Sequence, residues 1–370
     1  MSGKTNNFSI IIPFKTGKKY LLDCLHSVLG QDYPHFNIII LADNTSNIDD
    51  SIDAVNAIQS NKISIQIAQQ NIDILENWGR IKGLDKNEYM TILGYDDILE
   101  KTFLSNINEL INQQPEASLY HTHFNYINSK NGLIKKCQPL PSRLNASEYL
   151  EYALNETIDI MATGYVFKSS DYDALGGIPI HYPNLIYADL QLWLALTKKS
   201  YLAVDPSTQF SFRIHASTTK TSKDKILLDA FILFLDYLNT LKKESNALEH
   251  IIQVNAQKFC ESTTKAIAHR LLRTPKALRN GLSIDRMIEK INVKCISLEI
   301  PYEPLKIKSI RLARTSETYL MLNRIFFYSR KCTKSLFCKG EINYNYKKSY
   351  YFKFLALMAY KHLPNLDCSK

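Results

Sequence analysis

Short apolar runs alternate with amphipathic stretches at the start of the chain. The run Phe8–Pro13 is apolar almost throughout and stops at a proline, which is typical of a parallel strand buried on both faces. Residues 18–30 follow with leucine and valine at helical spacing, and Phe36–Leu41 is a second apolar run. The pattern therefore predicts strand, helix and strand in this order.

The same alternation continues to about residue 100. Ser51–Ser60 has helical spacing, Ile63–Ala68 alternates as a strand does, and Ile74–Leu84 is expected to be a helix. The next apolar run, Tyr89–Leu99, is strand-like and contains two adjacent aspartates near its end. This order predicts an α/β fold with a mostly parallel central sheet flanked by helices and joined by right-handed crossovers.

The second half of the chain predicts further strands and then only helices. Strands are expected at Ser118–Ile127, Thr163–Lys168 and Phe210–His215, and helices at 173–177 and 190–198. From about Thr221 the apolar residues keep helical spacing. We therefore predict two domains, an α/β catalytic domain over residues 1–220 and a helical, basic C-terminal region over residues 221–370.

The charge changes this picture only near the C-terminus. The net charge is +9, and the segment from Met321 onward holds ten lysines and arginines against two acids. The rest of the chain is nearly neutral, so a nucleic-acid groove is not expected. Between Arg324 and Lys361 the basic residues are interleaved with aromatic ones, which suits an anionic membrane surface. The alternative is that these aromatics pack on the catalytic domain.

The cysteine pattern and the apolar runs indicate a compartment. Seven scattered cysteines without a CxxC pair argue against a disulfide framework or a zinc ribbon. No charged-then-apolar leader opens the chain, and no run approaches about 20 apolar residues. The expected location is cytoplasmic, peripheral on the inner face of the cytoplasmic membrane.

Asp96 and Asp97 are the first candidates for chemistry. A buried parallel strand delivers its last residues to the carboxyl edge of the sheet, and paired carboxylates there suit a hard divalent cation, Mn²⁺ or Mg²⁺. The alternative is that they cap a helix starting near Glu100. None of the twelve glycines forms GxGxxG or a P-loop, so a metal is expected to hold any diphosphate. His121 and His123 share one strand face and are interpreted as ordinary strand residues.

Several segments carry a common resemblance in their order along the chain. They are Phe8–Phe14, Ala42–Ser46, Glu76–Arg80, Leu93–Asp97, Gly164–Gly177, Ala188–Leu194 and Arg213–Thr218. Together they resemble the inverting GT-A glycosyltransferases of family 2, especially bacterial polysaccharide and lipopolysaccharide enzymes. The resemblance covers about residues 8–220 and implies a GT-A nucleotide-diphospho-sugar transferase fold.

The resemblance implies a donor site built on three turns. Pro13 and Phe14 would border the nucleotide, and Asp43 would hold the base or ribose, with an Asx turn as its alternative role. Uridine is the expected base. Asp96 would bind the metal and, through it, the diphosphate, while Arg213 belongs to a closing Arg-x-His segment on the donor side.

The resemblance also implies the metal ligands and the base. Asp96, Asp97 and His215 are expected to hold the metal, with Asp97 either a ligand or an orienting neighbour. Asp189 is the expected catalytic base, and its alternative role is to cap the following helix. The family's acids at two motif positions are replaced here by Gly94 and Ala188.

The implied function is transfer of a sugar from a nucleotide-diphosphate donor to a glycan or lipid-linked saccharide in cell-surface polysaccharide synthesis, such as a capsule. The C-terminal helices are expected to contribute to acceptor choice, to oligomerisation or to both. Two rival functions also stay open. One is a catalytically idle relative that binds nucleotide sugars, suggested by Gly94 and Ala188, and the other is a nucleotidyltransferase.

Overall fold

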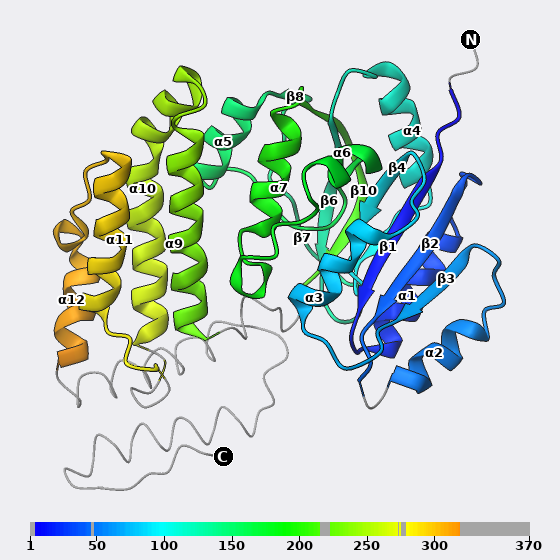
Figure 1. Cartoon of the computed structure of the whole chain (residues 1–370), viewed down its shortest axis with the longest axis horizontal. Coiled ribbons are helices and arrows are strands. Elements are labelled where there is room, and N and C mark those ends of the chain that lie inside the picture. The colour runs from blue at the N-terminus through cyan, green and yellow to red at the C-terminus, as the bar shows by residue number, and fades with distance from the viewer. Residues whose placement is uncertain (1–3, 46–47, 215–222, 273, 275–278, 319–370) are drawn as a thin grey trace, which may run out of the picture. The chain divides into compact units, whose positions relative to one another are not determined.

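The computed structural model describes residues 4–45, 48–214, 223–272, 274 and 279–318. Its sheet has ten strands: β1 (Phe8–Phe14), β2 (Phe36–Ala42), β3 (Ile63–Ile67), β4 (Tyr89–Ile92), β5 (Ile98–Leu99), β6 (Leu119–Ile127), β7 (Leu133–Lys136), β8 (Arg143–Leu144), β9 (Val166–Lys168) and β10 (Leu202–Arg213). The helices of this part are α1 (Lys18–Leu29), α2 (Ile48–Asn56), α3 (Ile74–Gly79), α4 (Phe103–Gln113), α5 (Ala146–Leu154), α6 (Ser169–Ala174) and α7 (Ala188–Thr197). Figure 1 shows them in chain order.

The strand order β3-β2-β1-β4-β9-β6-β10-β5 decides where the loops meet. β3, β2, β1 and β4 pair in parallel, and so do β6 and β10. The short strand β9 lies antiparallel between β4 and β6, so β6 and β10 run in the same direction as β4. The carboxyl ends of the six long strands therefore share one edge of the sheet, which confirms the predicted α/β arrangement.

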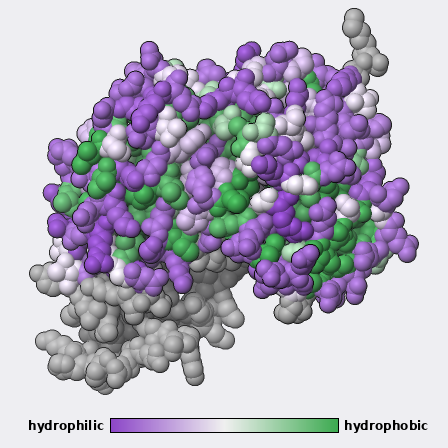
Figure 2. Space-filling model, in the orientation of Figure 1, coloured by the Kyte–Doolittle hydropathy of each residue, from purple (hydrophilic) through white to green (hydrophobic). Residues whose placement is uncertain are grey.

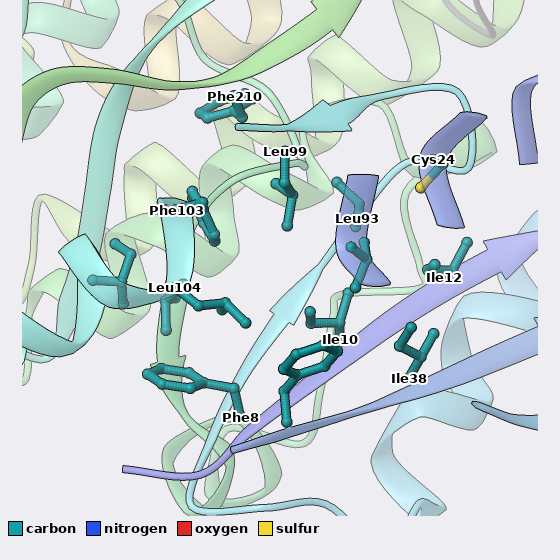
Figure 3. Close-up of a cluster of buried hydrophobic side chains, with 14 of the residues drawn as sticks. Phe8, Ile10, Ile12, Cys24, Ile38, Leu93, Leu99, Phe103, Leu104 and Phe210 are labelled. Atoms are coloured by element: carbon teal, nitrogen blue, oxygen red, sulfur yellow. The ribbon is translucent and has the colours of Figure 1, made fainter. Parts of the chain in front are cut away.

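One face of the sheet is covered by α1 and α4. Alternate residues of β1 point into this layer, where they meet Cys24 of α1 and the α4 residues Phe103 and Leu104 (Figure 3). Ile10 lies opposite Ile38 in register with β2. Every residue of β1 is buried, so its other face is covered too, as the unbroken apolar run predicts.

The edge strand β3 is more exposed than its neighbours. Ile63 and Ile65 are half-buried and Ile67 is 43% exposed, and Figure 2 shows hydrophobic colour over the part of the surface where β3 lies. Its alternating pattern in the sequence reflects one covered face, because Ile63 and Ile65 are half-buried while Ser64 and Gln66 on the opposite face are exposed.

Some predicted elements differ from those observed. The helix expected over Ile74–Leu84 divides into α3 and a 3₁₀ turn at Arg80–Gly83. The run Tyr89–Leu99 is two strands, because Tyr95 and Asp96 form a turn between β4 and β5. The helix expected at 173–177 is α6, which begins at Ser169 and ends before a Gly-Gly pair with positive φ.

The remaining helices are α9 (Asp224–Leu241), α10 (Asn246–Leu271), α11 (Ile284–Leu298) and α12 (Lys308–Thr318), which confirms the helical pattern beyond Thr221. The chain forms two compact units. The first contains residues 1–222 and 229–256, so most of α9 and the start of α10 belong with the sheet. The second contains residues 223–228 and 257–370.

Each unit has its own buried interior. In the second unit, α11 buries Ile284, Met287 and Ile291 on one helical stripe. Among the described residues, no helix is both long and apolar enough to cross a membrane. The basic, aromatic segment Arg324–Lys361 lies outside the described residues, so the membrane-surface prediction for it stays a prediction.

Candidate active site

Four of the predicted site segments meet at the carboxyl edge of the sheet. Phe14 ends β1, Asp43 follows β2, Asp96 and Asp97 follow β4, and Arg213 ends β10. Parallel strands bring these positions together although they are spread over two hundred residues of sequence. The donor residues predicted from the sequence therefore lie at this edge of the sheet. The contacts that these residues make define the geometry of the candidate site.

The Asp96–Asp97 turn is fixed by hydrogen bonds from distant segments. Asp97 is buried, its N–H donates to the Gly94 carbonyl, and its Oδ1 accepts from the Arg213 N–H at 2.9 Å. The Thr163 hydroxyl also hydrogen-bonds the Asp97 carboxylate, and Thr163 Oγ1 accepts from the Gly94 N–H at 3.0 Å. Thr163 reaches this place because β9 is antiparallel to β4, so its start lies at the end of β4.

The helix-capping alternative for Asp96 and Asp97 is wrong. The next helix, α4, begins at Phe103 and has Thr102 at its N-cap, five residues beyond Asp97. The carboxylate of Asp97 is directed to Arg213 and Thr163 instead. The two aspartates therefore serve the edge of the sheet and not a helix end.

Gly94 leaves the space in which the two carboxylates lie. A Cβ placed on Gly94 would be 2.6 Å from Asp97 Oδ2 and 3.0 Å from Asp96 Oδ1. It would also be 3.2 Å from Thr163 Oγ1. The glycine that replaces a family acid is thus required by this arrangement, because any side chain would displace one of the carboxylates.

Burial and mutual repulsion act on the acid pair. Burial, and after it the charge of Asp96, hold the pKa of Asp97 well above its ordinary value, against the hydrogen bond from Arg213. The thiol of Cys24, 3.6 Å from the Gly94 carbonyl, has its pKa raised by burial and then by both carboxylates. A cation at this turn would relieve the repulsion between the two carboxylates.

Arg213 ties three segments to the acid turn. Its side chain is almost fully buried, with Nε donating to the Asp96 carbonyl at 2.6 Å and Nη1 to the Asn128 carbonyl at 3.1 Å. The guanidinium lies 4.7 Å from the centre of the Tyr20 ring. Its Nη2 is buried without a hydrogen-bond acceptor, which leaves one charged donor available to a ligand.

Asp43 has one carboxylate oxygen engaged and one free. Its Oδ2 lies 2.9 Å from Lys15 Nζ, and its buried Oδ1 has no hydrogen-bond partner. A buried carboxylate oxygen without a donor costs free energy unless a ligand supplies one. The geometry thus fits a hydrogen bond from a nucleoside. Lys15 was not selected from the sequence, because a single lysine in a turn gives no signal.

The segment Glu76–Arg80 binds the backbone that leads into the Asp43 turn. Asn77 Nδ2 donates to the Leu41 carbonyl at 2.9 Å, and Arg80 donates to the carbonyls of Ala42 and Gln66 at 3.1 and 2.8 Å. Arg80 is therefore tied to the backbone of two strands and is not a freely solvated charge. Burial lowers its pKa, and its guanidinium holds the ends of β2 and β3 in place.

Pro13 and Phe14 form the buried wall at the end of β1. The Phe14 ring meets the Tyr95 ring edge to face at a centroid distance of 5.4 Å. Gly17, with φ +110°, lies under that ring, since a Cβ there would be 2.8 Å from Tyr95 Cε2. The apolar strand end thus anchors the turn that carries Asp96.

Asp189 lies in the first turn of α7. Tyr187 occupies the N-cap position, so the alternative role of Asp189 as the cap of this helix is wrong, although Asp189 Oδ1 accepts from the Leu190 N–H at 2.9 Å. Burial raises the pKa of Asp189 to about 6. Its charge in turn adds to the effect of burial in raising the pKa of Tyr149 and Tyr165. Asp189 therefore lies near these two phenols.

The residues behind Asp189 form a stacked core. Trp193 stacks on Tyr165 at 4.4 Å and donates from Nε1 to the Met161 carbonyl, so it is a core residue and not a platform for sugar. His121 stacks on the other side of Tyr165 at 3.9 Å. Burial lowers the pKa of His121 to about 3, and His123 Nε2 accepts from the Leu140 N–H. Both histidines are packed strand residues, as expected.

The donor set of the acid turn suits a hard divalent cation. No group of three or more His, Cys, Asp or Glu side chains converges within the described residues, so these residues offer at most two carboxylates at the acid turn. Mg²⁺ and Mn²⁺ commonly take one or two carboxylates together with substrate phosphates. The space over Gly94, bordered by oxygens of Asp96 and Asp97, fits this use. His215, the third expected ligand, lies outside the described residues.

The chain is similar in sequence to known glycosyltransferases. The model of the Glycosyl transferase family 2 matches residues 9–173. The glycosyltransferase GlyG of Streptococcus pneumoniae is 22% identical over 118 residues, 32% of this chain and 39% of GlyG. TuaG of Bacillus subtilis, provisionally assigned as a teichuronic acid biosynthesis glycosyltransferase, is 28% identical over 201 residues, 53% of this chain and 73% of TuaG. The chain thus aligns with about two fifths of GlyG.

Solved structures show the same architecture. The 1–349 fragment of S. aureus TarS in complex with UDP has a TM-score of 0.56 at 12% identity, covering 91% of this chain and 94% of that one. The same fragment with UDP-GlcNAc has a TM-score of 0.50 at 12% identity, covering 84% and 91%. At such identity the likeness shows the fold alone, and it confirms the GT-A fold expected from the sequence.

Proposed function

The chain belongs to glycosyltransferase family 2, and from this premise we propose that it moves a sugar from a nucleotide-diphosphate donor to a glycan or lipid-linked saccharide of the cell surface. The relatives support the acceptor class, since TuaG carries a provisional assignment to teichuronic acid biosynthesis. The observation that carries the proposal is the carboxyl edge of the sheet, where Asp43, Asp96 and Arg213 all stand at or just after strand ends.

The donor nucleoside is assigned to the end of β2. Asp43 Oδ1 is buried and lacks a donor, while Oδ2 is held by Lys15. A base N–H or a ribose hydroxyl would supply the missing donor, and a bond to a carboxylate is stronger than one to a neutral acceptor. The TarS fragment was solved with UDP and with UDP-GlcNAc, which supports a uridine donor as the first to test.

The diphosphate is assigned to the acid turn. Asp96 is the proposed metal ligand, and Asp97 orients the turn through its bonds to Arg213 and Thr163. A divalent cation bound there would neutralise the leaving diphosphate as a Lewis acid. The free Nη2 of Arg213 is available to a phosphate oxygen.

Asp189 is the proposed base that takes the proton from the acceptor hydroxyl. Transfer with inversion is a single displacement and needs one carboxylate opposite the leaving group. A base with a pKa of about 6 is deprotonated at neutral pH yet keeps more affinity for a proton than a solvated aspartate has. Ala188 is buried and offers no second carboxylate, which disfavours a retaining mechanism.

The test is a panel of nucleotide sugars against the full-length chain, with and without Mn²⁺ or Mg²⁺. Thermal shift reports binding, because a ligand at a hundred times its Kd adds about 2.7 kcal/mol to the native state. Release of nucleoside diphosphate together with a glycosylated product is the expected result. Release of pyrophosphate would indicate a nucleotidyltransferase, and binding without turnover would indicate an idle relative.

The idle relative is the weaker of these alternatives on the geometry. It was suggested by the loss of acids at Gly94 and Ala188. The space over Gly94 is used by the carboxylates of Asp96 and Asp97, so the glycine is compatible with a metal site. One carboxylate at Asp189 suffices for inversion, so Ala188 is compatible with turnover.

A further inference from the structure

The segment that leads into α7 has a strained backbone. Asn184, Leu185 and Tyr187 have φ of 53°, 57° and 72°, although none of them is glycine. Asparagine tolerates this left-handed region, but leucine and tyrosine do not favour it, so their backbone conformation is strained. Surrounding contacts must therefore hold the segment in this conformation.

Two aromatic side chains supply those contacts. Tyr182 is buried, and its hydroxyl donates to Gln191 Oε1 at 2.6 Å, which joins the segment to the first turn of α7. The Tyr187 ring stacks on Phe234 of α9 with centroids 4.9 Å apart and planes at 11°. Phe231 is a second neighbour on α9 at 6.0 Å.

The stack acts on the start of the catalytic helix. Tyr187 is the N-cap of α7, and its carbonyl accepts from the Gln191 N–H at 3.0 Å, which closes the first turn. Asp189 is two residues further on, within that turn. Phe234 is fully buried, so the surface on which Tyr187 rests is rigid. The place of the Asp189 carboxylate thus depends on where the Tyr187 ring is held.

We infer that Tyr187 is a positioning residue that fixes Asp189 by stacking on Phe234. The inference rests on the proposed role of Asp189 as the base. It gives a function to the part of α9 that holds Phe231 and Phe234, which lies outside the part of the chain matched by the family model but within the first compact unit. The helical region that follows the sheet therefore contributes to the catalytic machinery of its own unit.

Three variants of one residue separate the ring from the backbone. Tyr187→Phe keeps the ring and the strained φ. Tyr187→Gly removes the ring and also relieves the strain, because glycine adopts positive φ freely. Tyr187→Ala removes the ring and keeps the strain. The inference predicts that Phe is active, and that Gly is as inactive as Ala although Gly is the more stable of the two.

The kinetic readout is kcat and the KM for the donor. We expect kcat of Tyr187→Gly and of Phe234→Leu to fall on the order of 10- to 100-fold, the effect of misplacing a catalytic group by about 1 Å. The donor KM should stay within about twofold, since the donor residues lie on other elements. The double variant should lose no more than Tyr187→Gly alone, because the two rings act as one unit. A Tyr187→Gly variant with wild-type kcat would overturn the inference.

A second readout does not need turnover. Hydrogen exchange of the full-length chain measures protection of the amides at 188–192. These amides should exchange faster in Tyr187→Gly and in Phe234→Leu than in Tyr187→Phe, with β1 and β4 unchanged. Unaltered protection in both ring variants would refute the positioning role, even if no donor were found. The variants could show the predicted difference in exchange while the wild-type chain transfers no sugar. In that case the proposed function fails and the positioning of Asp189 stands.

Discussion

The backbone N–H of Arg213 donates a hydrogen bond to Asp97 Oδ1 over 2.9 Å, across 116 positions of sequence. The Arg213 side chain donates to the Asp96 carbonyl in the same place. Arg213, at the end of β10, thus hydrogen-bonds both aspartates of the turn after β4. A change at either strand end is expected to act on donor binding through this joint.

Gly94→Ala should weaken donor binding in Mn²⁺ more than tenfold, about 1.4 kcal/mol or more. The reason is that its Cβ would lie 2.6 Å from Asp97 Oδ2 and must displace a carboxylate. The matched control is Gly83→Ala, where a Cβ meets no atom within 4 Å. Calorimetric titration of both variants measures the difference. Equal affinities in the two variants would contradict the assignment of the acid turn.

Asp43→Asn should raise the donor Kd about tenfold, because a charge-assisted hydrogen bond is replaced by a neutral one. The control is Asp50→Asn. Both aspartates face a lysine, at 2.9 and 2.8 Å, but the Asp50 side chain is 76% exposed and that of Asp43 is 2% exposed. Binding of the nucleoside diphosphate alone should show the same contrast. A donor Kd unaffected by Asp43→Asn would place the nucleoside elsewhere.

The rate of transfer should depend on the protonation of Asp189. Burial raises its pKa to about 6, and the base must be deprotonated to accept the hydroxyl proton. We therefore expect kcat/KM for the donor to rise with pH through about 6 and then level off. A pH–rate profile with a saturating soluble acceptor measures this limb. A limb that persists unchanged in Asp189→Glu would assign it to another group.

Asp189→Asn should abolish transfer and yet stabilise the fold at pH 7. The folded-state pKa lies above the unfolded value of 3.8, so deprotonation disfavours the folded state. The penalty is absent below about pH 3.8 and complete above about pH 6, where it amounts to about 1–3 kcal/mol after allowance for partial exposure. Urea denaturation at pH 7 measures it.

The control for that variant is Asp171→Asn, which carries the opposite expectation. Asp171 pairs with Lys199 at 2.5 Å in a partly exposed ion pair, so its loss should cost up to about 1 kcal/mol. A destabilised Asp189→Asn variant would show that the Asp189 carboxylate is a structural group.

The basic C-terminal segment should bind anionic membranes. It carries most of the net charge, and each basic residue near an anionic leaflet contributes about 1 kcal/mol. Co-sedimentation with anionic and neutral vesicles, at low and high salt, compares the full chain with one ended before Arg324. Salt-sensitive binding to anionic vesicles that the truncation removes is the expected result. Binding unchanged by the truncation would mean that the segment is not an anchor.

The sequence by itself determined the fold and the outline of the proposed donor site. Apolar runs such as Phe8–Pro13 are long enough and uniform enough to predict strands buried on both faces, and the order of elements then implies a parallel sheet. That topology alone brings Asp43 and Asp96 to one edge, because parallel strands end on the same side. The periodicity of apolar residues and the order of the elements are local signals, so they can be recognised in one amino-acid sequence.

Only the tertiary structure decided how those residues are held. Thr163 reaches Gly94 because β9 is antiparallel, and β9 is too short to show its direction in the sequence. Arg80 binds carbonyls of two strands and Trp193 stacks within a core, which their positions on helices did not reveal. Tyr187 depends on Phe234, nearly fifty residues away. Such contacts join distant segments, and their energy depends on three-dimensional packing that no local pattern encodes.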